Sequence, residues 1–143
     1  MTPPSLTVFH GPWLGNNIYN ATGAHQSAVW VSSGSTGPSL LTFGISIQND
    51  GSAADRFTVK ATGAASAWTV TYSRGTTNIT SAVVAGTYRT PSLAPGATYL
   101  ISARITLPQS SNSNLSGNVA RLVTIRSVAN STKVDAVKFG FSL

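Results

Sequence analysis

Few side chains in this sequence can exchange a proton near neutral pH, and their types limit the chemistry available. They are His10, His25, Asp50, Asp55 and Asp135, and the chain has no Glu and no Cys. General acid–base catalysis needs paired titratable groups whose pKa values are shifted. Each Asp has a structural explanation instead, because one precedes a Gly in a turn sequence and the other two stand beside or near a basic residue. We therefore expect no catalytic pair.

Nucleophilic and metal chemistry find equally little support. The chain has 20 Ser residues, but no Gly-x-Ser-x-Gly sequence of the hydrolase kind. His10 and His25 stand far apart in irregular chain, and two ligands seldom make a protein metal site. Calcium at Asn49, Asp50 and Asp55 is the alternative, although calcium takes about six to eight oxygen ligands. We expect no metal, no cofactor and no enzymatic activity.

Aromatic residues are the next candidates, because exposed rings can stack on sugars or anchor a protein partner. Trp68 and Tyr99 occupy inward positions of predicted strands, which favours a place in the core. Trp13 and Trp30 stand in less regular chain, so both sugar stacking and the anchoring of a protein partner stay open as roles for them.

The basic residues are scattered along the chain. The net charge is +6, but no run of Lys and Arg occurs, so we do not expect nucleic-acid binding. Arg104 and Arg126 stand on predicted strands and are candidates for docking against an acidic lattice.

The elements that position these residues are β-strands, as two apolar runs show best. Phe43, Ile45 and Ile47 alternate with smaller residues, which is the period of a strand with one buried face. A second run covers 55–61, and the Asp-Gly pair between 40–48 and 55–61 predicts a hairpin with a loose turn.

Further strands follow along the chain. The predicted segments are 68–72, a short strand or a strand and corner at Ile79 and Val83–Val84, then 99–107, 119–127 and 134–143. Turns are predicted at Arg74-Gly75 and at Pro95-Gly96. Short strands at this spacing, with no helical period, indicate an all-β fold: a single antiparallel two-sheet β-sandwich of seven to nine strands spanning 1–143.

Composition adds a neutral, polar surface. Charged residues make up 8% of the chain, against roughly 25% in ordinary soluble proteins, whereas 41% are hydrophobic. No apolar stretch is long enough to span a membrane, and the first residues do not read as a signal peptide. Such neutral surfaces are common in extracellular and assembly proteins, so we expect an extracellular, cell-surface or virion-exterior location.

A set of phrases resembles immunoglobulin-like modules of bacterial secreted and surface proteins. These phrases are Trp13-Leu-Gly-Asn-Asn-Ile-Tyr-Asn-Ala-Thr-Gly23, Ile47-Gln-Asn-Asp-Gly-Ser-Ala-Ala-Asp-Arg-Phe57, Ala85-Gly-Thr-Tyr-Arg-Thr-Pro91 and Leu93-Ala-Pro-Gly96. The resemblance implies an immunoglobulin-like sandwich in an external setting. Such sandwiches also decorate phage particles. Because the phrases punctuate structure rather than chemistry, the resemblance assigns no functional residue.

Together these patterns predict a structural subunit of an external assembly, either a virion decoration or a cell-surface fibre, that docks through sheet edges and neutral patches. Its partners would be copies of itself in a homo-oligomer or larger assembly. Residues 1–12, with Leu6, Val8 and Phe9, are predicted to be an assembly arm or, equally, the domain's own edge strand. The alternative function is a carbohydrate-binding or adhesion module that uses Trp13 or Trp30.

Overall fold

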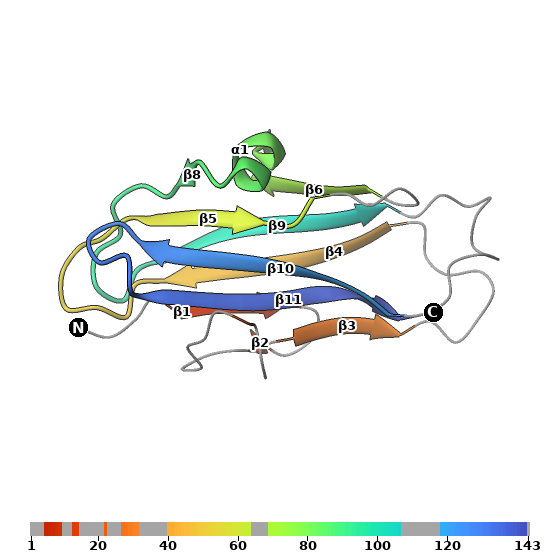
Figure 1. Cartoon of the computed structure of the whole chain (residues 1–143), viewed down its shortest axis with the longest axis horizontal. Helices are drawn as coiled ribbons and strands as arrows, with labels where there is room; N and C mark the ends of the chain where they lie inside the picture. The colour runs from red at the N-terminus through yellow and green to blue at the C-terminus, as the bar shows by residue number, and fades with distance from the viewer. Residues whose placement is uncertain are drawn as a thin grey trace.

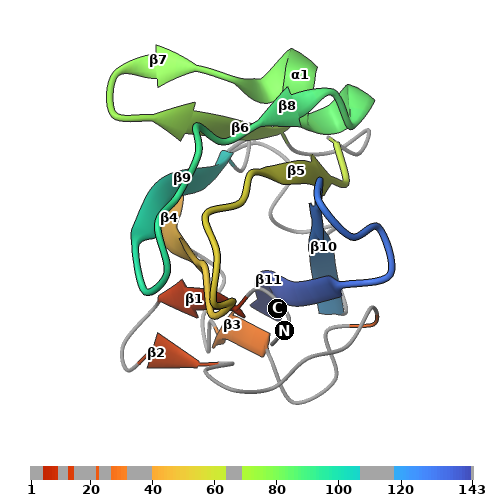
Figure 2. The same cartoon turned by 90° about the vertical axis from the view of Figure 1, so that its left-hand side faces the viewer.

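Two β-sheets pack face to face in the computed structural model, which describes residues 5–9, 13–14, 22, 27–31, 40–63, 69–106 and 118–142. In these residues one sheet has six strands in the order β2-β1-β4-β9-β6-β7, and the other has five in the order β3-β11-β10-β5-β8. In the view of Figure 1 the five-stranded sheet is the nearer layer, and Figure 2 shows the two layers from the side.

The bounds of the elements are as follows. The six-stranded sheet contains β1 Ser5–Phe9, β2 Trp13–Leu14, β4 Leu40–Gln48, β6 Thr69–Arg74, β7 Thr77–Asn78 and β9 Thr98–Thr106. The five-stranded sheet contains β3 Ser27–Val31, β5 Phe57–Ala61, β8 Tyr88–Arg89, β10 Asn118–Ser127 and β11 Val134–Ser142. The described residues also contain one helix, α1 Thr80–Ala85, between β7 and β8 in the sequence.

The core fills the space between the sheets and consists largely of alternate residues of β4, β5, β6, β9, β10 and β11, together with Ile79, Val83 and Leu93. Phe43 and Tyr72 of the six-stranded sheet are fully buried against Phe139 of the other. The rings of Phe43 and Phe139 have centroids 5.2 Å apart, and Tyr72 meets Phe139 edge-on at 6.1 Å. Aromatic pairs prefer such tilted geometries, and these rings join the two layers.

The predicted two-sheet all-β fold is confirmed. Eight of the described strands have five or more residues, within the predicted range, and β2, β7 and β8 are two-residue additions. Pairing is antiparallel in the described sheets, apart from β3, which runs parallel to β11 at the sheet edge.

The predicted hairpin between 40–48 and 55–61 is wrong, although both strands exist. β4 and β5 belong to different sheets, so residues 49–56 cross from one layer to the other. Both strands bury alternate residues in the same core, and period two alone does not show which sheet a strand joins. Gly51 also lacks the positive φ of a two-residue hairpin turn, unlike Gly75, Gly86 and Gly96.

The predicted strand at Val83–Val84 is also wrong, because these residues lie in α1. Ile79 and Val83 are four residues apart and both buried, so one turn of helix places them on the same core-facing side. Gly86 ends the helix at φ 74°, with its N–H donating to the carbonyl of Val83. Burial therefore overrides the strand preference of the β-branched residues.

Both predicted turns are confirmed. Gly75 has φ 58° and connects β6 to β7. At Pro95-Gly96 the N–H of Ala97 donates to the carbonyl of Ala94 at 2.9 Å, and Gly96 has φ 79°. Proline followed by a glycine with positive φ is the signature of a type II turn.

The N-terminal strand completes the chain's own sheet. β1 pairs antiparallel with β4, with Leu6 opposite Ile47 and Val8 opposite Ile45, and β2 pairs with its outer side. Of residues 1–12 the structure describes 5–9, which form a strand inside the chain's own sheet, and β2 rather than β1 stands at the sheet edge. Predictions on His10, His25 and Trp68 lie outside the described residues.

Candidate docking surface

One broad surface of the sandwich is nearly free of charge. It is the outward side of β4, β9 and β6, and we call it the neutral face. Its residues are Thr42, Gly44, Ser46, Gln48, Thr69, Thr71, Ser73, Thr98, Leu100, Ser102, Arg104 and Thr106. These residues alternate with buried ones along each strand, which is why they share one side of the sheet.

The register arranges the neutral face in rows across the strands. Arg104 stands between Thr42 and Thr71, and Ser102 stands between Gly44 and Ser73. Among the described residues of the face, Arg104 carries the one charge. Leu100 is its largest exposed apolar residue, at 47% exposure. A partner that covers this surface desolvates a single ion, Arg104, and otherwise meets an exposed Leu and hydroxyls that can form hydrogen bonds with it.

A tyrosine pair borders this face and joins the two sheets. The hydroxyls of Tyr88 in β8 and Tyr99 in β9 are 2.5 Å apart, and the guanidinium of Arg74 lies 4.2 Å from the centroid of the Tyr99 ring. Burial, together with the hydrogen bond to Tyr99, raises the pKa of Tyr88 to about 12, against the opposing charge of Arg74. Tyr99, predicted to be in the core, is half-buried and packs against it. The strand pattern gave no signal for the pair, since its members lie in different sheets.

The carboxylate of Asp55 is committed to structure. It accepts hydrogen bonds from the hydroxyl of Ser127 and from the backbone N–H groups of Arg56 and Ala129, at 2.7 and 3.1 Å for the two N–H groups. These bonds tie the 49–56 crossover to the β10–β11 turn.

Asn49 holds the start of the same 49–56 crossover in place. Its amide nitrogen donates to the carbonyls of Ala53 and Leu93, at 2.9 and 2.8 Å, and its side-chain oxygen accepts from the N–H of Gly51. The crossover is thus held to the 93–97 turn by a buried side chain, which leaves Asn49 little to offer a calcium ion. Within the described residues, no group of three or more His, Cys, Asp or Glu is placed to hold a metal.

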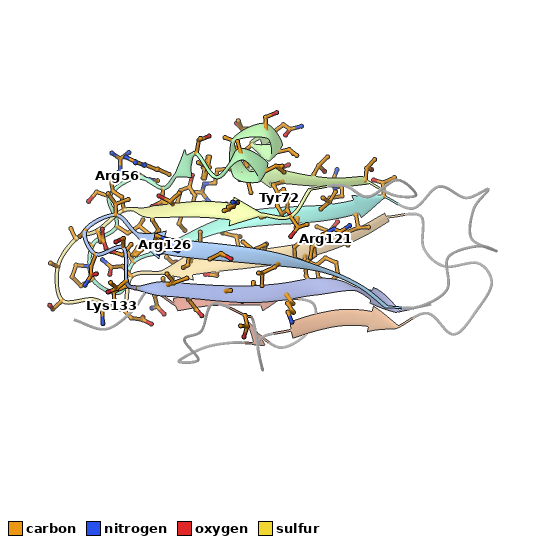
Figure 3. The ribbon with its side chains drawn as sticks, viewed as in Figure 1. Arg56, Tyr72, Arg121, Arg126 and Lys133 are labelled. Atoms are coloured by element: carbon orange, nitrogen blue, oxygen red, sulfur yellow. The ribbon has the colours of Figure 1, made fainter. Side chains whose placement is uncertain are left out.

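The two Arg residues that are candidates for docking against an acidic lattice lie on opposite sides of the sandwich. Arg104 stands on the neutral face, whereas Arg126 stands on the outward side of β10, on the face turned to the viewer in Figure 3. Both are exposed. They cannot meet one partner surface, although each alone can carry a contact.

The two aromatic candidates stand on edge strands of different sheets. Trp13 stands on β2 and Trp30 on β3, and these strands are the outer strands of their sheets at the same side of the sandwich. Figures 1 and 2 both place β2 and β3 at the lower side of the molecule as drawn. The assembly candidates Leu6, Val8 and Phe9 lie in β1, next to β2.

Across the described parts of the chain, no helix has the length and apolar character needed to cross a bilayer. No family model and no curated protein matches the sequence.

Solved structures do resemble the fold. A FixG-related protein from Vibrio parahaemolyticus aligns over 99% of this chain and 97% of its own, with a TM-score of 0.50 at 10% identity. The secreted serine protease VesC from Vibrio cholerae has a TM-score of 0.46 at 14% identity over 81% of this chain, which spans 20% of the length of VesC. A protein of unknown function from Porphyromonas gingivalis W83 has a TM-score of 0.45 at 16% identity, over 99% of this chain and 67% of its own. At 10% identity, the likeness to the FixG-related protein supports the fold alone.

Proposed function

We propose that this protein is a non-enzymatic structural module of an external assembly, and that it docks through the neutral face. The observation that carries the proposal is the outward side of β4, β9 and β6, where hydroxyls and one exposed Leu surround a single Arg. Interfaces are depleted of charge at their centres, because a buried ion must be desolvated. A virion exterior or a cell-surface fibre is the setting that suits such a surface.

We further infer that the sandwich is of the immunoglobulin-like kind. Its inner strands follow the orders β1-β4-β9-β6 and β11-β10-β5. If the seven strands are lettered A to G in the order of the chain, β1-β4-β9-β6 becomes ABED and β11-β10-β5 becomes GFC. These are the two sheets of an immunoglobulin constant-type domain. The correspondence supports the resemblance that the sequence phrases suggest.

The role of the acidic residues supports a non-enzymatic function. Asp55 is engaged by Ser127 and by two backbone N–H groups, and Asp135 is fully buried, with a carboxylate oxygen accepting from the N–H of Ala136. Both carboxylates therefore have structural partners.

Adding a charge at the centre of the neutral face tests the docking proposal. We expect Ser102→Glu to reduce self-association, because the new carboxylate would be desolvated in the contact. The matched control is Thr124→Glu, which adds the same charge to the outward side of the other sheet. Particle mass measured by light scattering and analytical ultracentrifugation reports the effect. Equal association of the wild type and Ser102→Glu would refute docking through this face.

Adhesion to glycans is the second candidate, and the placement of the tryptophan-bearing strands favours it. β2 and β3 lie at one side of the sandwich, so Trp13 and Trp30 stand on edge strands of different sheets. A glycan array with Trp13→Ala and Trp30→Ala separates the two functions. Loss of sugar binding in both variants, with assembly intact, would favour adhesion.

A further inference from the structure

A hollow runs along the outward side of the five-stranded sheet, between β5 and β10 and below the end of α1. We call it the basic groove. Its two adjoining parts have volumes of about 340 and 360 Å³ and share Lys60 and Thr124. Thr58, Gly86 and Arg126 line the first part, and Val84 and Leu122 stand in the second. In Figure 1 β5 and β10 lie side by side, with α1 above β5.

Strand register brings the two cations of the groove together. Lys60 stands opposite Thr124, and Arg126 stands opposite Thr58. Lys60 and Arg126 are therefore diagonal neighbours on the same side of the sheet, at a spacing of about 7–8 Å with their Cβ atoms somewhat closer. A charged group the size of a carboxylate or sulfate can reach both side chains at once.

Both cationic side chains are held in position. A Cβ on Gly86 would lie 3.1 Å from Cδ of Lys60, so the Lys60 stem lies along this glycine. The guanidinium of Arg126 donates to the carbonyl of Ser131 in the β10–β11 turn. That bond uses one of the five N–H donors of Arg126, which leaves its fork able to bind an oxyanion.

The surroundings of the groove are also positive. Arg89 stands opposite Thr58 on β8, and Lys138 stands opposite Leu122 on β11. None of the described residues that line the groove is acidic. Clustered charge of one sign raises the local concentration of an oppositely charged ligand.

The lining selects among anions. Thr58 and Thr124 offer hydroxyls to a polar ligand, and Val84, which is 38% exposed, offers an apolar wall beside Leu122. The described lining contains no aromatic ring on which a nucleobase could stack. Hydroxyls, a small apolar wall and two fixed cations fit a sugar that carries an acidic group.

We propose that the basic groove binds an acidic polysaccharide, with Lys60 and Arg126 gripping a sulfate or carboxylate and Thr58 and Thr124 bonding to the sugar. The site lies on the sheet opposite the neutral face and does not depend on docking there. The shared chemistry is an anionic group on a hydroxyl-rich ring, and the choice between sulfate and carboxylate is left to the test.

The test compares polymers that differ in charge. Dextran sulfate and polygalacturonate should bind in calorimetric titrations, whereas uncharged dextran should not, and binding should weaken as salt increases. Tighter binding of dextran sulfate would identify sulfate as the preferred group, and tighter binding of polygalacturonate would identify carboxylate. Binding of neither acidic polymer would overturn the proposal.

Variants then locate the site. Lys60→Gln and Arg126→Gln should each weaken binding by about fivefold, as expected for partly exposed ion contacts. Arg104→Gln is the matched control, since it removes the same charge from an exposed strand position between two Thr on the other sheet. Thermal unfolding checks that each variant folds. An equal loss from Arg104→Gln, or equal affinity for duplex DNA, would mean non-specific charge attraction and would overturn the proposal.

Discussion

At the scale of single residues, Tyr72 shows how much one side chain contributes to the core. It is fully buried, its ring meets Phe139, and its hydroxyl donates to the carbonyl of Thr62 at 2.8 Å. We expect Tyr72→Phe to keep the packing and lose this bond, which would lower the free energy of unfolding by about 1 kcal/mol. Urea unfolding at neutral pH measures the loss, and an unchanged value would mean that the hydroxyl contributes nothing to stability.

The same residue predicts a pH dependence. Burial raises the pKa of Tyr72 well above the ordinary value of 10.0. Above about pH 10, the ordinary pKa, the unfolded chain releases the proton of Tyr72 while the folded chain keeps it, so stability falls as pH rises. The stability contributed by the protonated Tyr72 is fully present below about pH 10. Above about pH 10 the free energy of unfolding falls by about 1.4 kcal/mol per pH unit. Unfolding in alkaline buffers should show a steeper fall for the wild type than for Tyr72→Phe, in which this group is absent.

Asp55 is the second residue whose effect can be isolated. Its carboxylate joins the crossover to Ser127 and to the N–H of Ala129. We expect Asp55→Ala to lower the free energy of unfolding by about 1–3 kcal/mol, because the part-buried Ser127 hydroxyl and two backbone N–H groups lose a charged acceptor. Combined with Ser127→Ala, the loss should be less than the sum of the single losses, since both substitutions break one shared bond. Strictly additive losses in urea unfolding would contradict this coupling.

At the scale of elements, the sequence predicts strands better than it predicts their neighbours. The alternation of Phe43, Ile45 and Ile47 marks a strand with one buried face, and the structure has it in β4. Both layers of a sandwich bury alternate residues in one core, however, so the pattern does not assign strands to sheets. The basic groove was missed for the same reason, because Lys60 and Arg126 become neighbours only through the pairing of β5 with β10.

The first strand provides an element-level test. β1 covers the side of β4 from Gly44 to Gln48. Deleting residues 1–12 should lower the unfolding midpoint and promote aggregation, because an unpaired strand edge invites pairing with another chain. A synthetic peptide of residues 1–14 should restore both properties by occupying the vacant edge, whereas a scrambled peptide should not. Unfolding curves and light scattering report the outcome. A truncated chain that stays monodisperse with an unchanged midpoint would show that β1 adds little to the fold.

At the scale of the whole molecule, the two sheets present unlike surfaces to their surroundings. The six-stranded sheet carries hydroxyls around a single Arg on its described outward side, whereas the five-stranded sheet carries the cations of the basic groove together with Arg89 and Lys138. Because the core separates the two surfaces, a partner on one leaves the other open. The two contacts that we propose would therefore link a neutral lattice on one side with an acidic polymer on the other.

This arrangement predicts that the two contacts can be lost separately. Ser102→Glu should reduce self-association while leaving the affinity for dextran sulfate unchanged, because Ser102 lies on the six-stranded sheet. Arg126→Gln should weaken dextran sulfate binding by about fivefold and leave the assembled mass unchanged. Sedimentation of each variant with and without dextran sulfate measures both properties in one experiment. If either substitution impaired both properties while thermal unfolding stayed normal, the two faces would share one partner surface, and the sandwich would act as a single contact rather than as a link between two.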